Sequence, residues 1–128
     1  MTPIEIIDET VKFYAQDSEG RRAVHRGSCM YLTPDNRSCA LGRLLTDETK
    51  TELVASGRNG AGVKNIFNSL SLASFKEQYR DAIRELMDKG DCIDFLMGLQ
   101  DLHDSASFWI SEELREQFVG DLKQNLAV

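Results

Sequence analysis

The chain has 128 residues, of which 41% are hydrophobic and 28% are charged, and this is the composition of a globular protein of one ordinary domain. Its formal net charge is −6. No apolar run approaches the roughly 20 residues that a membrane-spanning helix needs, so no membrane partner is expected.

The whole negative charge lies in the second half of the chain, because residues 65–128 contain six basic and twelve acidic side chains. An acidic face repels nucleic acids and favours basic protein partners, or it serves only as a solubilising surface. The N-terminus lacks the layout of a signal peptide, and three cysteines are too few and odd in number for a disulfide framework. We therefore expect a cytoplasmic protein with free thiols.

The first helix is predicted over residues 3–16. Thr2 can cap this helix, Glu5 completes a capping box with Thr2, and the apolar residues that follow recur at helical spacing. Residues 17–27 are then predicted to be a polar linker. Its basic side chains either contact an anion or an acidic partner, or pair with the acidic half of the protein. These side chains are Arg21, Arg22, His25 and Arg26.

A β-hairpin is predicted next, with strands at residues 29–32 and 38–41. Pro34 and Asn36 lie between the strands and favour a turn, because proline presets φ and asparagine tolerates the left-handed region. An isolated hairpin is only marginally stable in water, so its apolar side must pack on helices. Gly42 follows within an apolar run, which indicates a bend or a close backbone contact.

Residues 47–56 are predicted to form a short helix, followed by a loop that is rich in glycine. Three glycines in this loop, with Arg58 and Lys64 beside them, can form a nest of backbone N–H groups for a phosphate. The loop lacks the spacing of the known nucleotide-binding motifs. The alternative is a mobile connector without a ligand.

Four further helices are expected, at residues 63–70, 75–90, 92–103 and 111–125. Residues 92–103 are apolar nearly all round and are therefore predicted to be a central buried helix, with Gly98 in a close packing contact. The predicted fold class is mainly α (α+β). We expect a compact single globular domain, residues 1–128, of five or six helices with one short β-hairpin.

Two cysteines and a histidine are the candidate chemical groups. The predicted hairpin brings Cys29 and Cys39 together, and His103 ends the central helix beside Asp104. In one interpretation these residues hold zinc, with Asp104 or His25 as a fourth ligand, although the spacing of the cysteines fits no compact zinc knuckle. In a second, one thiol is a nucleophile that His103 activates. In a third, the thiols are core residues and His103 bonds a backbone carbonyl.

Aromatic and acidic side chains offer two further candidate surfaces. Tyr31 and Trp109 either line a binding surface or close the core at the end of the buried helix. Asp88, Asp91 and Asp94 lie in the acidic half, and we expect charge reversal there to abolish the binding of a basic partner without unfolding the protein.

Eleven residues form a pattern that is spread along the chain: Cys29, Tyr31, Cys39, Ala40, Gly42, Leu44, Leu99, Gln100, His103, Asp104 and Trp109. Their order resembles that in a group of small proteins encoded by bacteriophages and bacteria. The resemblance covers residues 28–110, and it implies a source and a fold rather than a reaction. The group usually has a glycine in the turn where this chain has Asp35 and Asn36.

The function expected from the sequence is that of a non-enzymatic small acidic binding protein, a modulator or inhibitor of a host protein in the bacterial cytoplasm. The alternative is a small-ligand or metal-binding protein that uses the hairpin cysteines and His103, or the loop from Gly57 to Lys64. A thiol hydrolase is the third possibility. No cofactor is expected, apart from zinc under the alternative.

Overall fold

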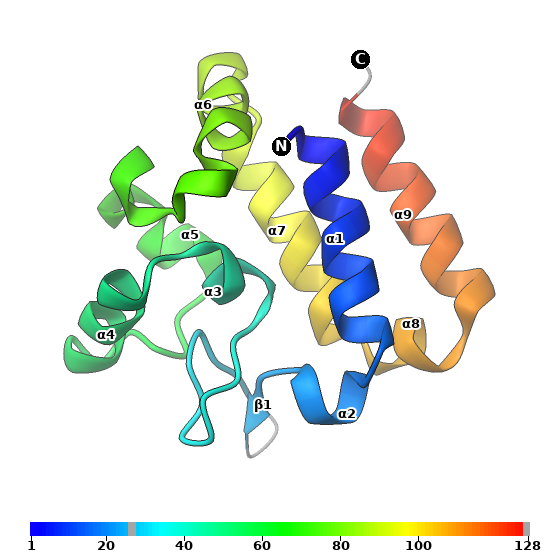
Figure 1. The fold of residues 1–128 in the computed structure, drawn as a ribbon, viewed down its shortest axis with the longest axis horizontal. Helices are drawn as coiled ribbons and strands as arrows, with labels where there is room; N and C mark the ends of the chain where they lie inside the picture. Colours follow the sequence, from blue (N-terminus) through cyan, green and yellow to red (C-terminus); the bar gives the residue numbers. More distant parts are fainter. Residues whose placement is uncertain (26–27, 127–128) are drawn as a thin grey trace.

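The computed structural model describes residues 1–25 and 28–126, and of residues 24–25 and 28–29 it describes only the backbone. The fold of this part of the chain is mainly helical, but it contains nine α-helices, so the expectation of five or six is wrong (Figure 1). Its α-helices are α1 (Pro3–Ala15), α2 (Ser18–Arg21), α3 (Ala40–Leu44), α4 (Asp47–Ala55), α5 (Val63–Ile66), α6 (Arg80–Lys89), α7 (Cys92–Asp104), α8 (Ala106–Ile110) and α9 (Glu112–Leu126). Short 3-10 helices are η1 (Phe67–Ser69), η2 (Leu72–Ser74) and η3 (Glu77–Tyr79).

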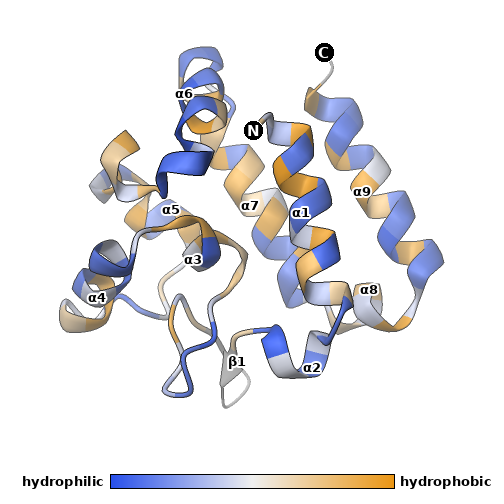
Figure 2. Ribbon diagram, viewed as in Figure 1, coloured by the Kyte–Doolittle hydropathy of each residue, from blue (hydrophilic) through white to orange (hydrophobic). Residues whose placement is uncertain are grey.

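Helix α7 is the centre of the fold, as its sequence predicts. It contacts α1 and α9 as well as α3, α5 and α6 (Figure 1). Figure 2 shows α7 mostly in apolar colours, whereas α9 is largely hydrophilic. The buried side chains of α7, which include Phe95, Leu96 and Leu99, join the core formed by the surrounding helices. Burial of this apolar surface is the main source of stability for such a fold.

The helix ends that the sequence marks are largely confirmed. Thr2 Oγ1 accepts a hydrogen bond from the Glu5 N–H, and the Glu5 carboxylate accepts one from the Thr2 N–H, which completes the capping box. Thr46 caps α4 in a similar way. At the other end of a helix, Gly90 closes α6 with φ at 77°, a conformation that glycine adopts without strain.

The predicted β-hairpin is wrong. Residues 38–41 do not form a strand, because Cys39 is the N-cap of α3, and its Sγ accepts a hydrogen bond from the Gly42 N–H. A short apolar run does not distinguish a strand from a buried helix, and here burial on all sides favours the helix. Within the described residues, the only paired strands are Val24–His25 (β1) and Ser28–Cys29 (β2), which are antiparallel, and one isolated bridge joins Leu45 to Phe75. Of the predicted hairpin, only Cys29 lies in a strand.

The turn inside the predicted hairpin does exist. The Asn36 N–H donates to the Thr33 carbonyl, and the Thr33 N–H donates to the Arg37 carbonyl. Asn36 has φ at 63°, the left-handed conformation that asparagine tolerates. The turn therefore joins two irregular segments instead of two strands.

Two other boundaries differ from the sequence prediction. The helix expected over residues 75–90 begins only at Arg80, because Phe75 pairs with Leu45 in an isolated bridge and the Lys76 N–H donates to the Leu44 carbonyl. These extended contacts prevent helical geometry at residues 75–76. The linker predicted at residues 17–27 contains the short helix α2, which Asp17 caps.

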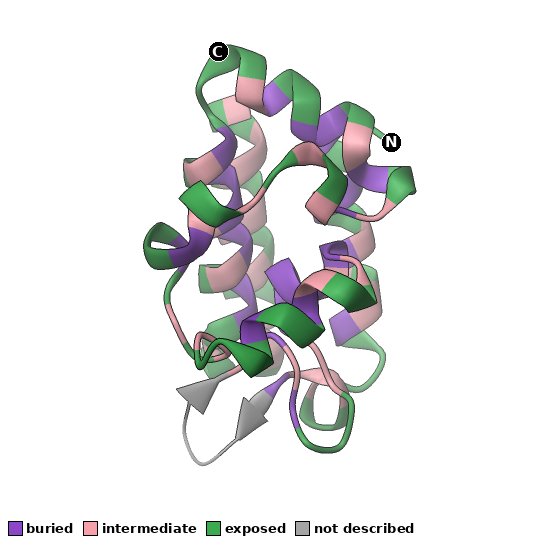
Figure 3. Ribbon diagram, turned by 90° about the vertical axis from the view of Figure 1, so that its left-hand side faces the viewer, coloured by how far each residue is buried: buried purple, intermediate pink, exposed green. Residues whose placement is uncertain are grey.

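Helix α9 lies on the outside of the molecule. Figure 3 shows buried positions on the inner sides of the helices and exposed positions on the outer sides, and none of the residues of α9 is fully buried. The close contact predicted for Gly98 of α7 is made with Leu122 of α9. In residues 1–25 and 28–126, no helix combines the length and the apolar character needed to cross a bilayer.

Candidate functional site

His103 is completely buried at the end of α7, where it joins three parts of the chain. Its Nε2 accepts a hydrogen bond from the Ala23 N–H at 3.0 Å, and its Nδ1 lies 2.8 Å from Asp104 Oδ1. Because Nε2 accepts, Nδ1 carries the proton and donates to the carboxylate. The ring of Tyr14 meets the imidazole edge-on, with the centroids 5.0 Å apart. His103 therefore holds α1, α7 and the segment before β1 together.

Arg22 and Trp109 cover the end of the same helix. Arg22 donates from Nε to the His103 carbonyl and from Nη2 to the Asp104 carbonyl, and these carbonyls have no partner within α7. Trp109 Nε1 donates to the Leu102 carbonyl at 2.9 Å, and its ring lies 5.8 Å from that of Tyr14. Both side chains use their polar atoms inside the fold, so the structure gives them a packing role.

The cysteines are not assembled into a site among the described residues. Cys39 is buried and caps α3, and Cys92 is buried at the start of α7. The side chains of Cys29 and His25, which the zinc hypothesis needs, lie outside the described residues. Within the described part of the chain, no group of three or more His, Cys, Asp or Glu side chains is placed to hold a metal ion.

Burial also makes the two described thiols poor nucleophiles. Burial raises the pKa of Cys39 to about 12 from an ordinary value of 9.0, although the Gly42 N–H opposes this shift. Burial raises the pKa of Cys92 to about 11. Because the thiolate is the reactive form, neither side chain is activated at neutral pH.

The other residues that carry the sequence pattern fix the segment before α3 against the core. Tyr31 is 2% exposed, and its hydroxyl donates to the Ala61 carbonyl. Gln100 Oε1 accepts from the Leu41 N–H, a donor at the start of α3 that has no partner in the helix. A Cβ atom at Gly42 would lie 2.4 Å from the Tyr31 carbonyl oxygen, so only glycine fits there.

Side chains of the glycine loop form hydrogen bonds within the fold. Arg58 donates to Ser56 Oγ and to Ser69 Oγ, and the side chain of Asn59 pairs with both backbone groups of Leu32. Lys64 is exposed at the first turn of α5, which has only four residues. The contacts of Arg58 and Asn59 fix the loop to its neighbours, and no phosphate-binding geometry follows from them.

Asp91 and Asp94 lie beside a groove that the sequence does not reveal. The groove has a volume of about 290 Å³ and is formed by α1, α7 and α9. Its apolar lining comes from all three helices, and both aspartates are exposed. The complete lining is Ile7, Asp91, Asp94, Phe95, Leu99, Leu122, Asn125 and Leu126.

The groove exists because α9 does not cover α7 completely. Leu122 rests over Gly98, which allows α9 to approach α7 at that level, while the side chains of Phe95 and Leu99 remain in contact with the groove. Pro3, Ile4 and Lys89 line a second hollow that shares Asp91 and Leu126 with it. In the sequence, the apolar residues of the groove look like ordinary core positions. That Ile7, Phe95, Leu99 and Leu122 line one groove could therefore not be predicted.

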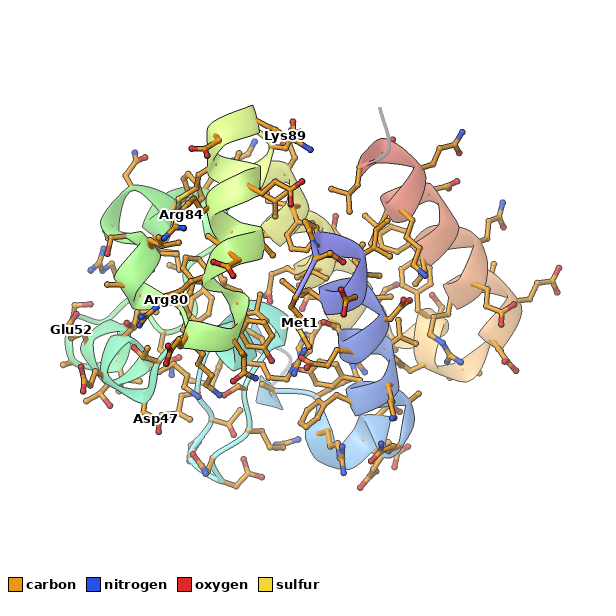
Figure 4. The ribbon with its side chains drawn as sticks, turned by 45° about the horizontal axis from the view of Figure 1, so that its top comes forward. Met1, Asp47, Glu52, Arg80, Arg84 and Lys89 are labelled. Atoms are coloured by element: carbon orange, nitrogen blue, oxygen red, sulfur yellow. The ribbon has the colours of Figure 1, made fainter. Side chains whose placement is uncertain are left out.

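The charge of the groove is negative. Asp88, Asp91 and Asp94 are exposed, and none of them forms an ion pair with another described residue. Lys89, at the C-terminal end of α6 (Figure 4), lines the neighbouring hollow, but its ammonium lies 3.1 Å from the Glu85 carboxylate and pairs with it. An apolar floor beside two free carboxylates suits a ligand that has an apolar side chain next to a positive charge.

Comparison with known proteins gives no further guide to the site: no family model matches this chain, and no curated protein or solved structure matches it.

Proposed function

We propose that this chain is a non-enzymatic binding protein, and that it docks a basic and apolar segment of another protein in the groove between α1, α7 and α9. The observation that carries the proposal is the groove itself, in which the side chains of Phe95 and Leu99 lie beside the unpaired carboxylates of Asp91 and Asp94. Apolar contact would supply affinity, and the carboxylates would select a cationic partner.

Two further observations support a binding role. The side chains that could perform catalysis are engaged in the fold, since His103 Nε2 accepts from Ala23 and the Cys39 thiol has a pKa raised to about 12 by burial. The groove is smaller than most sites for drug-sized ligands, which occupy about 300–1,000 Å³. It therefore suits one or two side chains of a larger partner. The resemblance to phage and bacterial proteins is what favours a host protein as that partner.

The experiment begins with the protein isolated gently from its own host without a chelator and weighed by native mass spectrometry. A co-purifying polypeptide is then produced separately, and its affinity is measured for wild type and for Asp91→Lys and Asp94→Lys variants. Glu52→Lys is the matched control, because Glu52 is an exposed acid on α4, away from the groove (Figure 4).

We expect each groove variant to weaken binding by about tenfold or more, which corresponds to about 1.4 kcal/mol, and the control to bind like wild type. All three variants should retain the unfolding midpoint of the wild type within a few degrees, since the substituted side chains are exposed. Equal affinity of the groove variants and the control would contradict the proposal. An added mass of zinc, without a polypeptide, would favour the metal-binding alternative instead.

A further inference from the structure

A second pocket, of about 260 Å³, lies at the other end of α1, and its charge is opposite to that of the groove. It shares no lining residue with the groove. Five of its nine lining residues are basic and none is acidic, although the chain as a whole has a net charge of −6. The basic residues are Arg21, Arg37, Arg43, Lys50 and Lys76, and the others are Phe13, Gly20, Asn36 and Ser38.

Three of these cations have a carboxylate partner at the edge of the pocket. Arg43 Nη1 lies 2.7 Å from the Glu9 carboxylate, and Arg37 Nε lies 2.9 Å from that of Asp35. Lys50 Nζ lies 3.5 Å from Asp47, at the start of α4 (Figure 4). The Asp47 side chain is 94% exposed, so this third ion pair is screened by water and neutralises Lys50 only weakly.

Arg21 and Lys76 have no carboxylate partner among the described residues. Arg21 donates to the Phe13 carbonyl, and its guanidinium lies 4.6 Å from the centroid of the Phe13 ring. The Lys76 ammonium makes no hydrogen bond or ion pair within the described chain. The pKa of Lys76 is lowered, first by partial burial and then by the positive charge of Lys50. The pocket therefore carries uncompensated positive charge.

One side chain that lines the pocket also has a buried donor without a partner among the described residues. Arg43 Nε makes no hydrogen bond in residues 1–25 and 28–126, while the rest of its guanidinium is bound to Glu9, Thr10 and Tyr79. A buried N–H group without an acceptor costs about 1–3 kcal/mol, so such groups usually meet water or a ligand oxygen. Arg43 is held in place before any ligand arrives, and this preorganisation lowers the cost of binding.

We propose that this pocket binds the phosphate group of a small phosphorylated molecule. A phosphate supplies the oxygen acceptors that Arg43 Nε and the Lys76 ammonium lack. Its two negative charges match Arg21 and Lys76, the two cations that have no carboxylate partner among the described residues. The volume is below the usual range for drug-sized ligands, which indicates a compact ligand. The Phe13 ring provides an apolar wall between Arg21 and Arg43. The pocket is independent of the groove and gives the protein a second ligand.

The test is a titration followed by NMR of the arginine Nε–H groups at low ionic strength. Inorganic phosphate and glycerol 3-phosphate are the probes, and glycerol is the uncharged control. We expect both phosphates to shift the Arg43 Nε–H resonance in a saturable manner, and added sodium chloride to weaken the binding, because the attraction is electrostatic.

Two variants with the same change of charge make the test specific. Lys76→Gln removes a cation whose side chain contributes no hydrogen bond to the fold, so the variant should fold normally, and we expect its phosphate affinity to fall about tenfold. Lys64→Gln is the matched control in the first turn of α5, just after the glycine loop, and it should bind like wild type. Arg21→Gln provides a second pocket variant and should weaken binding to a similar degree.

Several results would overturn the proposal. The first is the lack of any saturable shift with either phosphate. The second is an equal loss of affinity in Lys76→Gln and Lys64→Gln, which would indicate the glycine loop or the overall charge. Binding of inorganic phosphate without glycerol 3-phosphate would exclude a phosphorylated molecule as the ligand. Binding of a phosphoserine peptide without either small phosphate would assign the pocket to a protein partner.

Discussion

At the scale of single residues, His103 has a structural role. Its position beside Asp104 in the sequence suggests a chemical role instead. Its ring nitrogens bond the Ala23 N–H and the Asp104 carboxylate, and its ring packs on Tyr14. The substitution His103→Phe keeps the ring and removes the acceptor. We expect it to destabilise the protein by about 1–3 kcal/mol, because the Ala23 N–H then loses its partner in a buried place.

Urea denaturation of the His103→Phe variant measures this loss. The substitution His103→Ala should lower the free energy of unfolding further, since it also leaves a cavity. A free energy of unfolding unchanged from wild type in His103→Phe would contradict the structural role, and would return His103 to the list of candidate functional groups.

The buried thiol of Cys39 predicts how stability depends on alkaline pH. Burial raises the pKa of Cys39 from 9.0 to about 12 in the folded protein, so its contribution to stability is complete below pH 9. As the pH rises from 9 through 12, the unfolded chain loses this proton before the folded chain does, and the free energy of unfolding falls. Burial also raises the pKa of Tyr14 and of Tyr31, and both add to the same trend.

Urea denaturation at a series of pH values from 7 to 12 tests this prediction, with Cys39→Ala as the comparison. The variant should start from a lower stability and lose less of it above pH 9. Parallel curves for the two proteins would show that Cys39 does not stay protonated in the fold.

At the scale of elements, the glycines of α3 and α7 are predicted to respond differently to alanine. At Gly42 a Cβ atom meets the backbone carbonyl of Tyr31, which cannot move without shifting the chain, so Gly42→Ala should destabilise by about 1–3 kcal/mol. At Gly98 the Cβ atom meets only the end of the Leu122 side chain. Leu122 can rotate, and the gain in helix propensity of about 1 kcal/mol offsets the crowding.

Thermal unfolding of Gly42→Ala and Gly98→Ala, measured side by side, distinguishes the two contacts. Equal destabilisation would mean that α9 is held against α7 as rigidly as α3 is held against Tyr31. That result would contradict the loose packing of α9 on α7, to which we attribute the groove.

The sequence predicts elements well where a local signal is decisive. The capping box of Thr2 and Glu5 marks the start of α1, and the nearly continuous apolar surface of residues 92–103 marks α7 as the buried helix. The prediction for residues 38–41 is wrong because the local signal is ambiguous. A short apolar run beside a turn is compatible with a strand, but in the structure Cys39 caps the helix α3. What decides between the two is tertiary packing, namely the contact of Gly42 with Tyr31.

Of the candidate sites, the sequence could predict single residues but not their assembly. Asp91 and Asp94 stand out as acids in an acidic half, and Arg21 stands out in a basic cluster. The groove needs Ile7 and Leu122, which are more than a hundred residues apart, so no local pattern could join them. The basic pocket similarly depends on α1, α3 and α4 meeting at one corner.

At the scale of the whole molecule, the charges are sorted onto two sites at opposite ends of α1. The groove beside Ile7 carries free carboxylates, and the pocket beside Phe13 carries free cations. Neither site draws on Cys39 or His103, which serve the fold. We therefore propose a helical scaffold with two binding surfaces of opposite charge, each of which can be altered without unfolding the protein.

The most direct test of the groove is site-specific photocrosslinking in the native host. Benzoylphenylalanine at Asn125, an exposed residue of the groove, should crosslink a polypeptide, and the same group at Val54, an exposed apolar residue of α4, should not. The crosslink should disappear when Asp91 and Asp94 are both changed to lysine. A crosslink from Val54 alone, or one from Asn125 that survives the double charge reversal, would contradict the account.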